Sequence, residues 1–308
     1  MTSSNSTVVL TGASGFLAAW ILPKLIARGH RVIAVDLARD ETRLCQVMQG
    51  PAPQGIAWEL ADLTDDRTLF RIVERYAAST ILHLAALQIP ACRANPIAGA
   101  KVNVVGHVGA LEAARNVGAR IVYTSSIAAK PRGLANAPAN LYGVFKRADE
   151  EIARLYAEDF GVASFGLRPH VVYGIGRDQG ETSAVTSAMR AAAFGANYTV
   201  PWTTATCFQL ADDIAEMFVR VIESEWSGAH LADMTDAIES TADIIAAIRE
   251  CAPGANVSAE GPERLSPTSG FDVAALERII GPRPLTPLGE GVRQTIEHFR
   301  GLRAKGLV

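Results

Sequence analysis

The stretch that decides the fold is Val8-Val-Leu-Thr-Gly-Ala-Ser-Gly-Phe-Leu-Ala18. A short β-branched run leads into Gly12 and Gly15, and a longer segment of helical periodicity follows. Glycines lack a Cβ, so backbone N–H groups approach a ligand closely there. The positive end of a helix also favours a pyrophosphate. The stretch therefore predicts a strand, a glycine turn and a helix that bind a dinucleotide.

The same alternation of strand and helix continues through the first half of the chain. Apolar runs without polar alternation predict buried parallel strands at 7–11, 31–36, 56–60, 80–84, 120–125 and 162–168. Helix-length segments lie between them at 15–28, 64–76, 95–117 and 141–159. The pattern predicts an α/β fold with a Rossmann-type doubly wound parallel sheet. Pro23 is expected to kink the first helix without ending it.

After Tyr173 the pattern becomes looser, with glycines first and recurring Pro and Gly later. Helical periodicity returns at 211–223, 242–251, 273–280 and 289–301. We predict an NAD-binding domain over 1–173, with 207–232 returning to it. A smaller, mainly helical substrate-binding region is predicted over 174–206 and 233–308.

Composition argues against several classes of protein. The 308 residues carry a net charge of −3 without a block of Lys and Arg, so nucleic-acid binding is not expected. No apolar run is long enough to predict a membrane span. The four cysteines and six histidines show no metal-ligand spacing, so no metal is expected. The N-terminus lacks the features of a signal peptide, which favours a cytoplasmic location.

Residues at the ends of the next predicted strands narrow the identity of the expected dinucleotide. Asp36 ends the second strand at the distance expected for contact with ribose hydroxyls. Its charge would repel a 2′-phosphate, which favours NAD, whereas Arg39 keeps NADP as the alternative. Asp62-Leu63 is well placed to hold an adenine edge. In His83-Leu-Ala-Ala86 the small residues leave room for a cofactor, and His83 and His170 are expected to be packed, hydrogen-bonded side chains.

Tyr142-Gly-Val-Phe-Lys146 places a tyrosine and a lysine on one face of a helix. A free tyrosine has a pKa near ~10 and is a poor base at neutral pH. A neighbouring ammonium group favours the phenolate form, especially beside a positively charged nicotinamide. The hydroxyls of Tyr123-Thr-Ser-Ser126, at the end of the fifth strand, could orient a substrate oxygen beside the tyrosine.

Together these motifs resemble the extended short-chain dehydrogenase/reductase family, also called the NAD-dependent epimerase/dehydratase family. They follow the order of the family over about two-thirds of the chain. The matching segments are TGASGFLA, Asp36, Asp62-Leu63, HLAA, Val102-Asn-Val-Val-Gly, YTSS, YGVFK, Arg168-Pro-His-Val-Val-Tyr-Gly174 and Asp212-Asp-Ile-Ala215.

The resemblance implies NAD as cofactor and catalysis by Ser126, Tyr142 and Lys146, with Ser125 a close competitor of Ser126. Asn103 resembles an asparagine that steadies the lysine through water, although a surface amide is the alternative. A homodimer packed through the helices that carry Asn103 and Tyr142 is also implied. The implied cofactor contacts are Gly12, Ser14, Gly15, Phe16, Leu17, Asp36, Asp62, Leu63, Leu84, Ala85, Ala86, Thr124, Tyr142, Lys146, Pro169 and Val171.

Departures from the family pattern bear on the substrate. Ala18 replaces a third glycine and still permits close helix packing. Nucleotide-sugar enzymes of the family usually carry an asparagine at the position of Val171 and an arginine near Thr206. A diphosphate without such partners binds poorly. The expected substrate contacts are Gln88, Ser125, Ser126, Arg177 and Ser183. Arg177 could hold a carboxylate or phosphate. For the segment 176–183, which carries Arg177 and Ser183, a solvated loop is the alternative.

These observations predict an NAD-dependent oxidoreductase or epimerase that acts on a hydroxyl-bearing carbon. The expected substrate is a small polyhydroxylated molecule, a sugar or a sugar acid. A nucleotide-sugar 4-epimerase is the alternative within the enzyme class. A non-catalytic NAD-binding regulator is the alternative outside it, because this fold hosts such proteins.

Overall fold

A seven-stranded parallel sheet forms the centre of the computed structural model, which describes residues 6–65, 67–132 and 136–308. The strand order is β11-β6-β5-β4-β1-β2-β3, and every neighbouring pair is parallel. The predicted Rossmann-type sheet is confirmed. Its strands are β1 Thr7–Thr11, β2 Arg31–Asp36, β3 Ala57–Leu60, β4 Thr80–His83, β5 Arg120–Thr124, β6 Ser164–Arg168 and β11 Ala229–Asp233.

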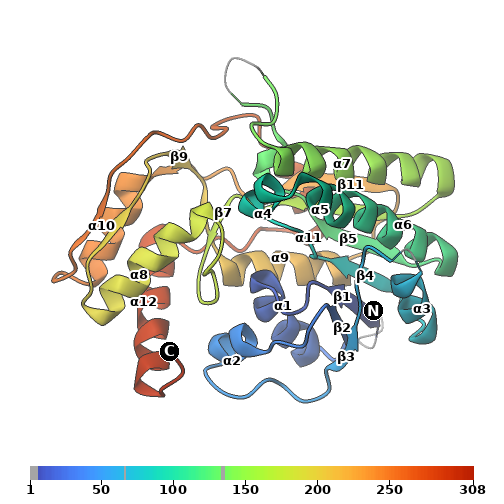
Figure 1. Cartoon of the computed structure of the whole chain (residues 1–308), viewed down its shortest axis with the longest axis horizontal. Coiled ribbons are helices and arrows are strands. Elements are labelled where there is room, and N and C mark those ends of the chain that lie inside the picture. The colour runs from blue at the N-terminus through green and yellow to red at the C-terminus, as the bar shows by residue number, and fades with distance from the viewer. Residues whose placement is uncertain (1–5, 66, 133–135) are drawn as a thin grey trace.

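Helices cover both faces of this sheet (Figure 1). One face packs against α1 Phe16–Ala27, α2 Thr42–Met48, α9 Ala211–Glu223 and α11 Ala274–Ile280. The other face packs against α3 Thr68–Arg75, α6 Gly106–Val117 and α7 Leu141–Phe160. In β1, Val8 and Leu10 point into the first layer while Val9 points into the second. Apolar residues on both faces of each strand follow from this double cover.

The predicted helices agree with the structure apart from several local differences. The predicted helix 95–117 consists of α5 Pro96–Ala100, a π-helical turn η1 Lys101–Val105, and α6. Asn95 caps its start by accepting a hydrogen bond from the Ala98 N–H at 3.0 Å. Helix α1 continues through Pro23. Three further helices were not predicted: α2, α4 Ile89–Ala94 and α8 Ala184–Phe194.

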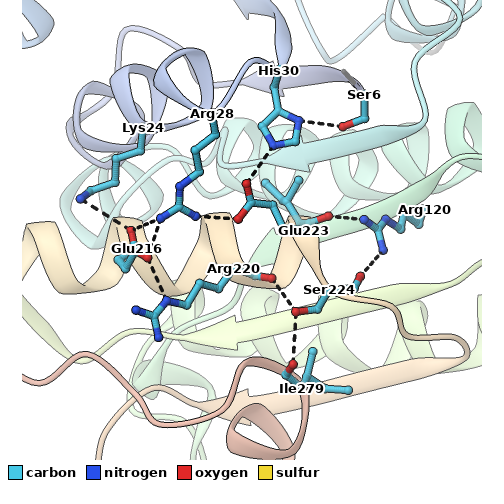
Figure 2. Close-up of polar contacts among 11 residues, drawn as sticks. Ser6, Lys24, Arg28, His30, Arg120, Glu216, Arg220, Glu223, Ser224 and Ile279 are labelled. Atoms are coloured by element: carbon cyan, nitrogen blue, oxygen red, sulfur yellow. Dashed lines mark hydrogen bonds and ion pairs between the residues drawn. The ribbon is translucent and has the colours of Figure 1, made fainter. Parts of the chain in front are cut away.

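Charged side chains join α1 to α9 at the edge of the first helical layer (Figure 2). The Arg28 guanidinium lies 2.6 Å from Glu216 and 2.7 Å from Glu223. Glu216 also pairs with Arg220 at 2.8 Å, and Lys24 reaches Asp212 at 2.8 Å. Because several partly buried charges share partners, this network holds the two helices together more firmly than an isolated surface ion pair would.

The C-terminal part adds a second apolar core beside the sheet, to the left in Figure 1. Helix α8 packs there with α10 Thr241–Cys251 and α12 Leu288–Ala304. Three two-stranded sheets lie outside the central sheet: β7 Val171–Tyr173 with β10 Phe208–Leu210, β8 Tyr198–Val200 with β13 Val257–Ala259, and β9 Ala205–Thr206 with β12 Glu239–Ser240. Among the described helices, none has the length and apolar character needed to cross a membrane.

Candidate active site

A cavity of about 250 Å³ lies where the carboxyl ends of the central strands meet the C-terminal part. The segments after β1, β4, β5 and β6 line it through Gly12, Ala86, Ser126 and Pro169. The C-terminal part contributes its wall from 177–182, 202–206 and 264–266. Ligands of doubly wound sheets bind at this edge, where the chain leaves two neighbouring strands toward opposite faces of the sheet.

The glycine turn after β1 is packed tightly against the segment after β4. Gly12 has φ of +73°, and a Cβ there would lie 2.8 Å from the Ala85 nitrogen. A Cβ on Gly15 would lie 2.8 Å from the Gly12 carbonyl oxygen, which accepts a hydrogen bond from the Gly15 N–H. Only glycine fits these positions, so the turn leads straight into the N-terminus of α1.

Two carboxylates stand at the ends of adjacent strands beside this turn. Asp36 ends β2, and its side chain accepts hydrogen bonds from the N–H groups of Ser14 at 2.9 Å and Leu37 at 2.7 Å. Asp62 follows β3 and is exposed, with one oxygen bonded to the Thr64 N–H at 2.9 Å. The glycine turn and the Asp36 carboxylate therefore fit a dinucleotide whose pyrophosphate lies at α1 and whose ribose lies at β2.

Helix α7 brings Tyr142 to the cavity. Asn140 caps the helix by accepting a hydrogen bond from the Gly143 N–H at 2.9 Å. A side chain at Gly143 would collide with the Ala128 carbonyl oxygen, so glycine allows α7 to lie against the 3₁₀ turn η2 Ile127–Ala129. This close packing places Tyr142 and Ser126 on the wall of the same cavity.

Lys146 lies one turn after Tyr142 and is only 2 % exposed. Its Nζ donates to the Thr124 carbonyl at 2.9 Å and to Asp149 Oδ2 at 3.2 Å. Burial opposes its charge, but Asp149 and Tyr142 raise the pKa of Lys146 above the usual value of a lysine. The site therefore holds a buried ammonium group beside the tyrosine. Burial raises the pKa of Asp149 itself to about 7, against the opposing effect of Lys146.

The two candidate serines differ in what their hydroxyls contact. The Ser125 hydroxyl donates to the buried carboxylate of Glu150, which also pairs with Arg168 at 2.7 Å. The Ser126 hydroxyl accepts a hydrogen bond from the Ala128 N–H at 3.1 Å, and its hydrogen remains available to another acceptor. Both residues line the cavity. Since the Ser125 hydrogen is already donated, this arrangement favours Ser126 as the partner of Tyr142.

Asn103 lies on the π-helical turn η1 and is buried. Its side-chain oxygen accepts from the Leu87 N–H at 2.7 Å, and its amide donates to the Leu87 carbonyl at 2.9 Å. The hydrogen bonds of Asn103 thus go to the segment after β4 rather than to Lys146. This residue fixes the segment 84–87, and an effect on Lys146 through water stays a prediction.

The other predicted contacts divide between the cavity and its surroundings. Gln88 and Arg177 line the cavity and lie 3.5 Å apart, whereas the Ser183 hydroxyl donates to the Gly180 carbonyl at 2.8 Å. Arg177 also donates to the Thr182 hydroxyl at 2.9 Å. The predicted cofactor contacts that line the cavity are Gly12, Gly15, Phe16, Leu17, Leu84, Ala86, Thr124, Tyr142, Pro169 and Val171.

Three basic residues that sequence reasoning did not assign to the site also line the cavity: Arg132, His170 and Arg264. His83 is hydrogen-bonded as predicted, to the Thr11 hydroxyl at 2.8 Å. The same expectation for His170 is wrong, because neither of its ring nitrogens has a hydrogen-bond partner among the described residues. His170 lies within the motif Arg168–Gly174, between the predicted contacts Pro169 and Val171, whereas no local pattern marks Arg132 and Arg264.

Comparison with known proteins gives a consistent result. Residues 8–234 match the model of the NAD dependent epimerase/dehydratase family. The chain is 28 % identical over 309 residues to a UDP-glucose 4-epimerase of Mycolicibacterium smegmatis, covering 95 % of this chain and 98 % of that protein.

Solved structures share the fold. An L-threonine dehydrogenase of Clostridium difficile superposes with a TM-score of 0.83 at 21 % identity, covering 98 % of this chain and 99 % of that one. A UDP-glucose 4-epimerase of Thermus thermophilus in complex with NAD has a TM-score of 0.78 at 24 % identity, covering 96 % and 99 %.

Proposed function

The chain belongs to the NAD dependent epimerase/dehydratase family, an enzyme family that uses NAD, and we propose that it oxidises a hydroxyl-bearing carbon of a small polyhydroxylated substrate. The observation that carries this proposal is the joint placement of Ser126 and Tyr142 on one cavity, with the buried Lys146 behind them.

In the proposed reaction, bound NAD supplies the hydride acceptor. The Tyr142 oxygen would take the proton of the substrate hydroxyl, with the buried Lys146 ammonium one helical turn away on the same helix. Ser126 would donate a hydrogen bond to the same substrate oxygen and orient it. Gly12, Gly15 and Asp36 would hold the phosphate and ribose of the cofactor. If the oxidised substrate rotates in the cavity and is reduced again on its opposite face, the same groups perform an epimerisation.

A nucleotide-sugar 4-epimerase is the second candidate, favoured by the similarity to the Mycolicibacterium smegmatis enzyme over nearly the whole chain. Against it stand Val171 and Thr206, which line the cavity where polar and cationic groups would hold a diphosphate. Arg264 is close by, but its guanidinium already pairs with Glu181 at 2.7 Å. Binding of UDP at micromolar concentration would favour this second candidate.

A direct test compares the wild-type protein with Tyr142→Phe. Both are assayed with sugars, sugar acids, L-threonine and UDP-glucose for NADH formation and for epimerised product, and for NAD binding by calorimetry. We expect turnover to fall by at least about 10²-fold in Tyr142→Phe, the usual contribution of a positioned acid–base group, with NAD affinity preserved. A Tyr142→Phe protein with normal turnover would refute the mechanism. NAD binding without turnover in either protein would favour a regulator.

We also propose a homodimer packed through α5, η1 and α7. Apolar side chains are exposed on these elements: Ile97 at 72 %, Val105 at 52 % and Val144 at 47 %. Exposed apolar groups gathered on neighbouring helices are typical of an interface. Light scattering after size exclusion should give twice the chain mass, and Val144→Glu should shift the protein to monomers. A wild-type protein that is monomeric at micromolar concentration would rule the dimer out.

A further inference from the structure

Arg132 and His170 line the cavity beside Tyr142, yet the proposed reaction uses neither of them. The Arg132 Nε is buried without a hydrogen-bond partner among the described residues. Its guanidinium makes a bond of 3.3 Å to the Leu265 carbonyl, and the charge that acts on it most is that of another cation, Arg264. Burial and Arg264 both lower the pKa of Arg132. This guanidinium thus carries a charge that no carboxylate within the described part of the chain balances.

His170 is in a similar position. Its side chain is nine-tenths buried, and neither ring nitrogen has a partner among residues 6–65, 67–132 and 136–308. One edge of the ring packs on Phe271, with 5.0 Å between the ring centroids. Burial, then the cations Lys130, Arg132 and Arg168, lower the pKa of His170 to about 3. The imidazole is therefore neutral and offers one N–H donor to a ligand.

The other cations around His170 have their counter-charges. Lys130 pairs with Asp233 at 2.8 Å, and Arg168 pairs with Glu150 at 2.7 Å. Arg264 pairs with Glu181 at 2.7 Å. Leaving the buried Nε of a cation and a buried imidazole N–H unpaired is costly, so such groups normally face a ligand or an ordered water that satisfies them. Arg177, which also lines the cavity, likewise has a buried Nε without a partner in the described part of the chain, but it is not among the cations that act on His170. Beside His170, the one unbalanced charge of Arg132 next to a neutral donor matches a ligand group with one negative charge and two oxygens.

We propose that Arg132 and His170 form a subsite for a carboxylate of the substrate. The guanidinium supplies the charge and two N–H donors, and the imidazole supplies a third donor. The substrate is then a small hydroxy acid, whose hydroxyl lies at Tyr142 while its carboxylate lies at Arg132. The inference rests on the proposed function, because it places both groups of one substrate in the same cavity.

The test measures binding of acids and matched neutral polyols to the NAD-loaded full chain by calorimetry. The probes are D-gluconate with sorbitol, L-threonate with L-threitol, and D-glycerate with glycerol. We expect at least one acid to bind about tenfold or more tightly than its polyol, a difference of ~1.4 kcal/mol. Arg132→Gln should remove this preference, whereas Arg278→Gln, which changes an exposed arginine away from the cavity lining, should keep it.

A second measurement uses the wild-type protein alone, so it does not depend on how the variants fold. Binding of the preferred acid should shift the ring ¹⁵N resonances of His170, assigned with His170→Phe, and the matched polyol should leave them in place. The subsite is refuted if no acid is preferred, if the preference survives Arg132→Gln, or if the His170 resonances do not move. Tighter binding of glycerol 3-phosphate than of D-glycerate would contradict a carboxylate site.

The same measurements distinguish a failure of the proposed subsite from a failure of the proposed oxidation. Neutral polyols that are oxidised with no preference for acids would leave the reaction at Tyr142 intact and refute the subsite. Acids that bind through Arg132 and yield neither NADH nor an epimer would keep the subsite and refute the oxidation.

Discussion

Replacing Asp149 by asparagine tests how the buried charges behind Tyr142 are balanced. Asp149 has no exposed surface, and its Oδ1 is buried without a partner in the described part of the chain. Burial outweighs the attraction of Lys146 and raises the pKa of Asp149 to about 7, whereas an unfolded aspartate titrates near ~3.9. Between these values the folded protein keeps a proton that the unfolded chain has lost. Asp149 by itself therefore makes the free energy of unfolding fall as the pH rises from ~4 to ~7, whereas His83 and His170, whose pKa values burial lowers to about 3, make it rise over the same range.

The difference of about three pKa units corresponds to ~4 kcal/mol over the whole range, and to about 2–3 kcal/mol between pH ~5 and pH ~8. Asp149→Asn cannot titrate, so its free energy of unfolding should lack this part of the pH dependence. Asp159→Asn, an exposed position on the same helix, should keep it.

The assay is urea unfolding of the three proteins without cofactor at both pH values, analysed by linear extrapolation. The quantity compared is the change in unfolding free energy from the lower to the higher pH, which should be about 2–3 kcal/mol more positive in Asp149→Asn than in the wild-type protein. A change in Asp149→Asn within about 0.5 kcal/mol of the wild-type change would show that Lys146 keeps Asp149 ionised throughout, and would refute the reasoning.

Three further substitutions test the packing, the charge network and the cofactor site. Gly143→Ala should push α7 away from the Ala128 carbonyl and lower kcat by about 10²-fold, measured as NADH formation; an unchanged kcat would show that the contact does not position Tyr142. Glu216→Gln should lower the free energy of unfolding, measured in urea, by about 1–3 kcal/mol, because Arg28 and Arg220 lose their shared carboxylate. A decrease of less than ~0.5 kcal/mol would show that the shared carboxylate does not stabilise the fold. Asp36→Ala should weaken NAD binding in calorimetry by about tenfold or more and reduce the preference for NAD over NADP; an unchanged preference would mean that another residue selects the cofactor.

The sequence by itself determined the parallel sheet, the glycine turn and the helix that carries Tyr142 and Lys146. Each of these depends on neighbours along the chain. A strand buried on both faces is apolar at successive positions, as at Val8, Val9 and Leu10 of β1, and residues four apart lie on one face of a helix. Gly12 and Gly15 mark the turn because their backbone geometry and close contacts exclude any Cβ. The π-helical turn η1 inside the predicted helix 95–117 gave no such local signal.

Only the tertiary structure decided which side chains meet in the cavity. Both serines line the cavity, but the Ser125 hydroxyl donates its hydrogen to Glu150, whereas the Ser126 hydroxyl accepts from the Ala128 N–H and keeps its own hydrogen available. Arg132, His170 and Arg264 approach one another from segments up to 132 residues apart (264 − 132 = 132). Hydrophobic periodicity reports burial along one element, whereas the balance of charge at a site depends on which elements pack together. The packing of the C-terminal part against the strand ends therefore determines which side chains line the cavity.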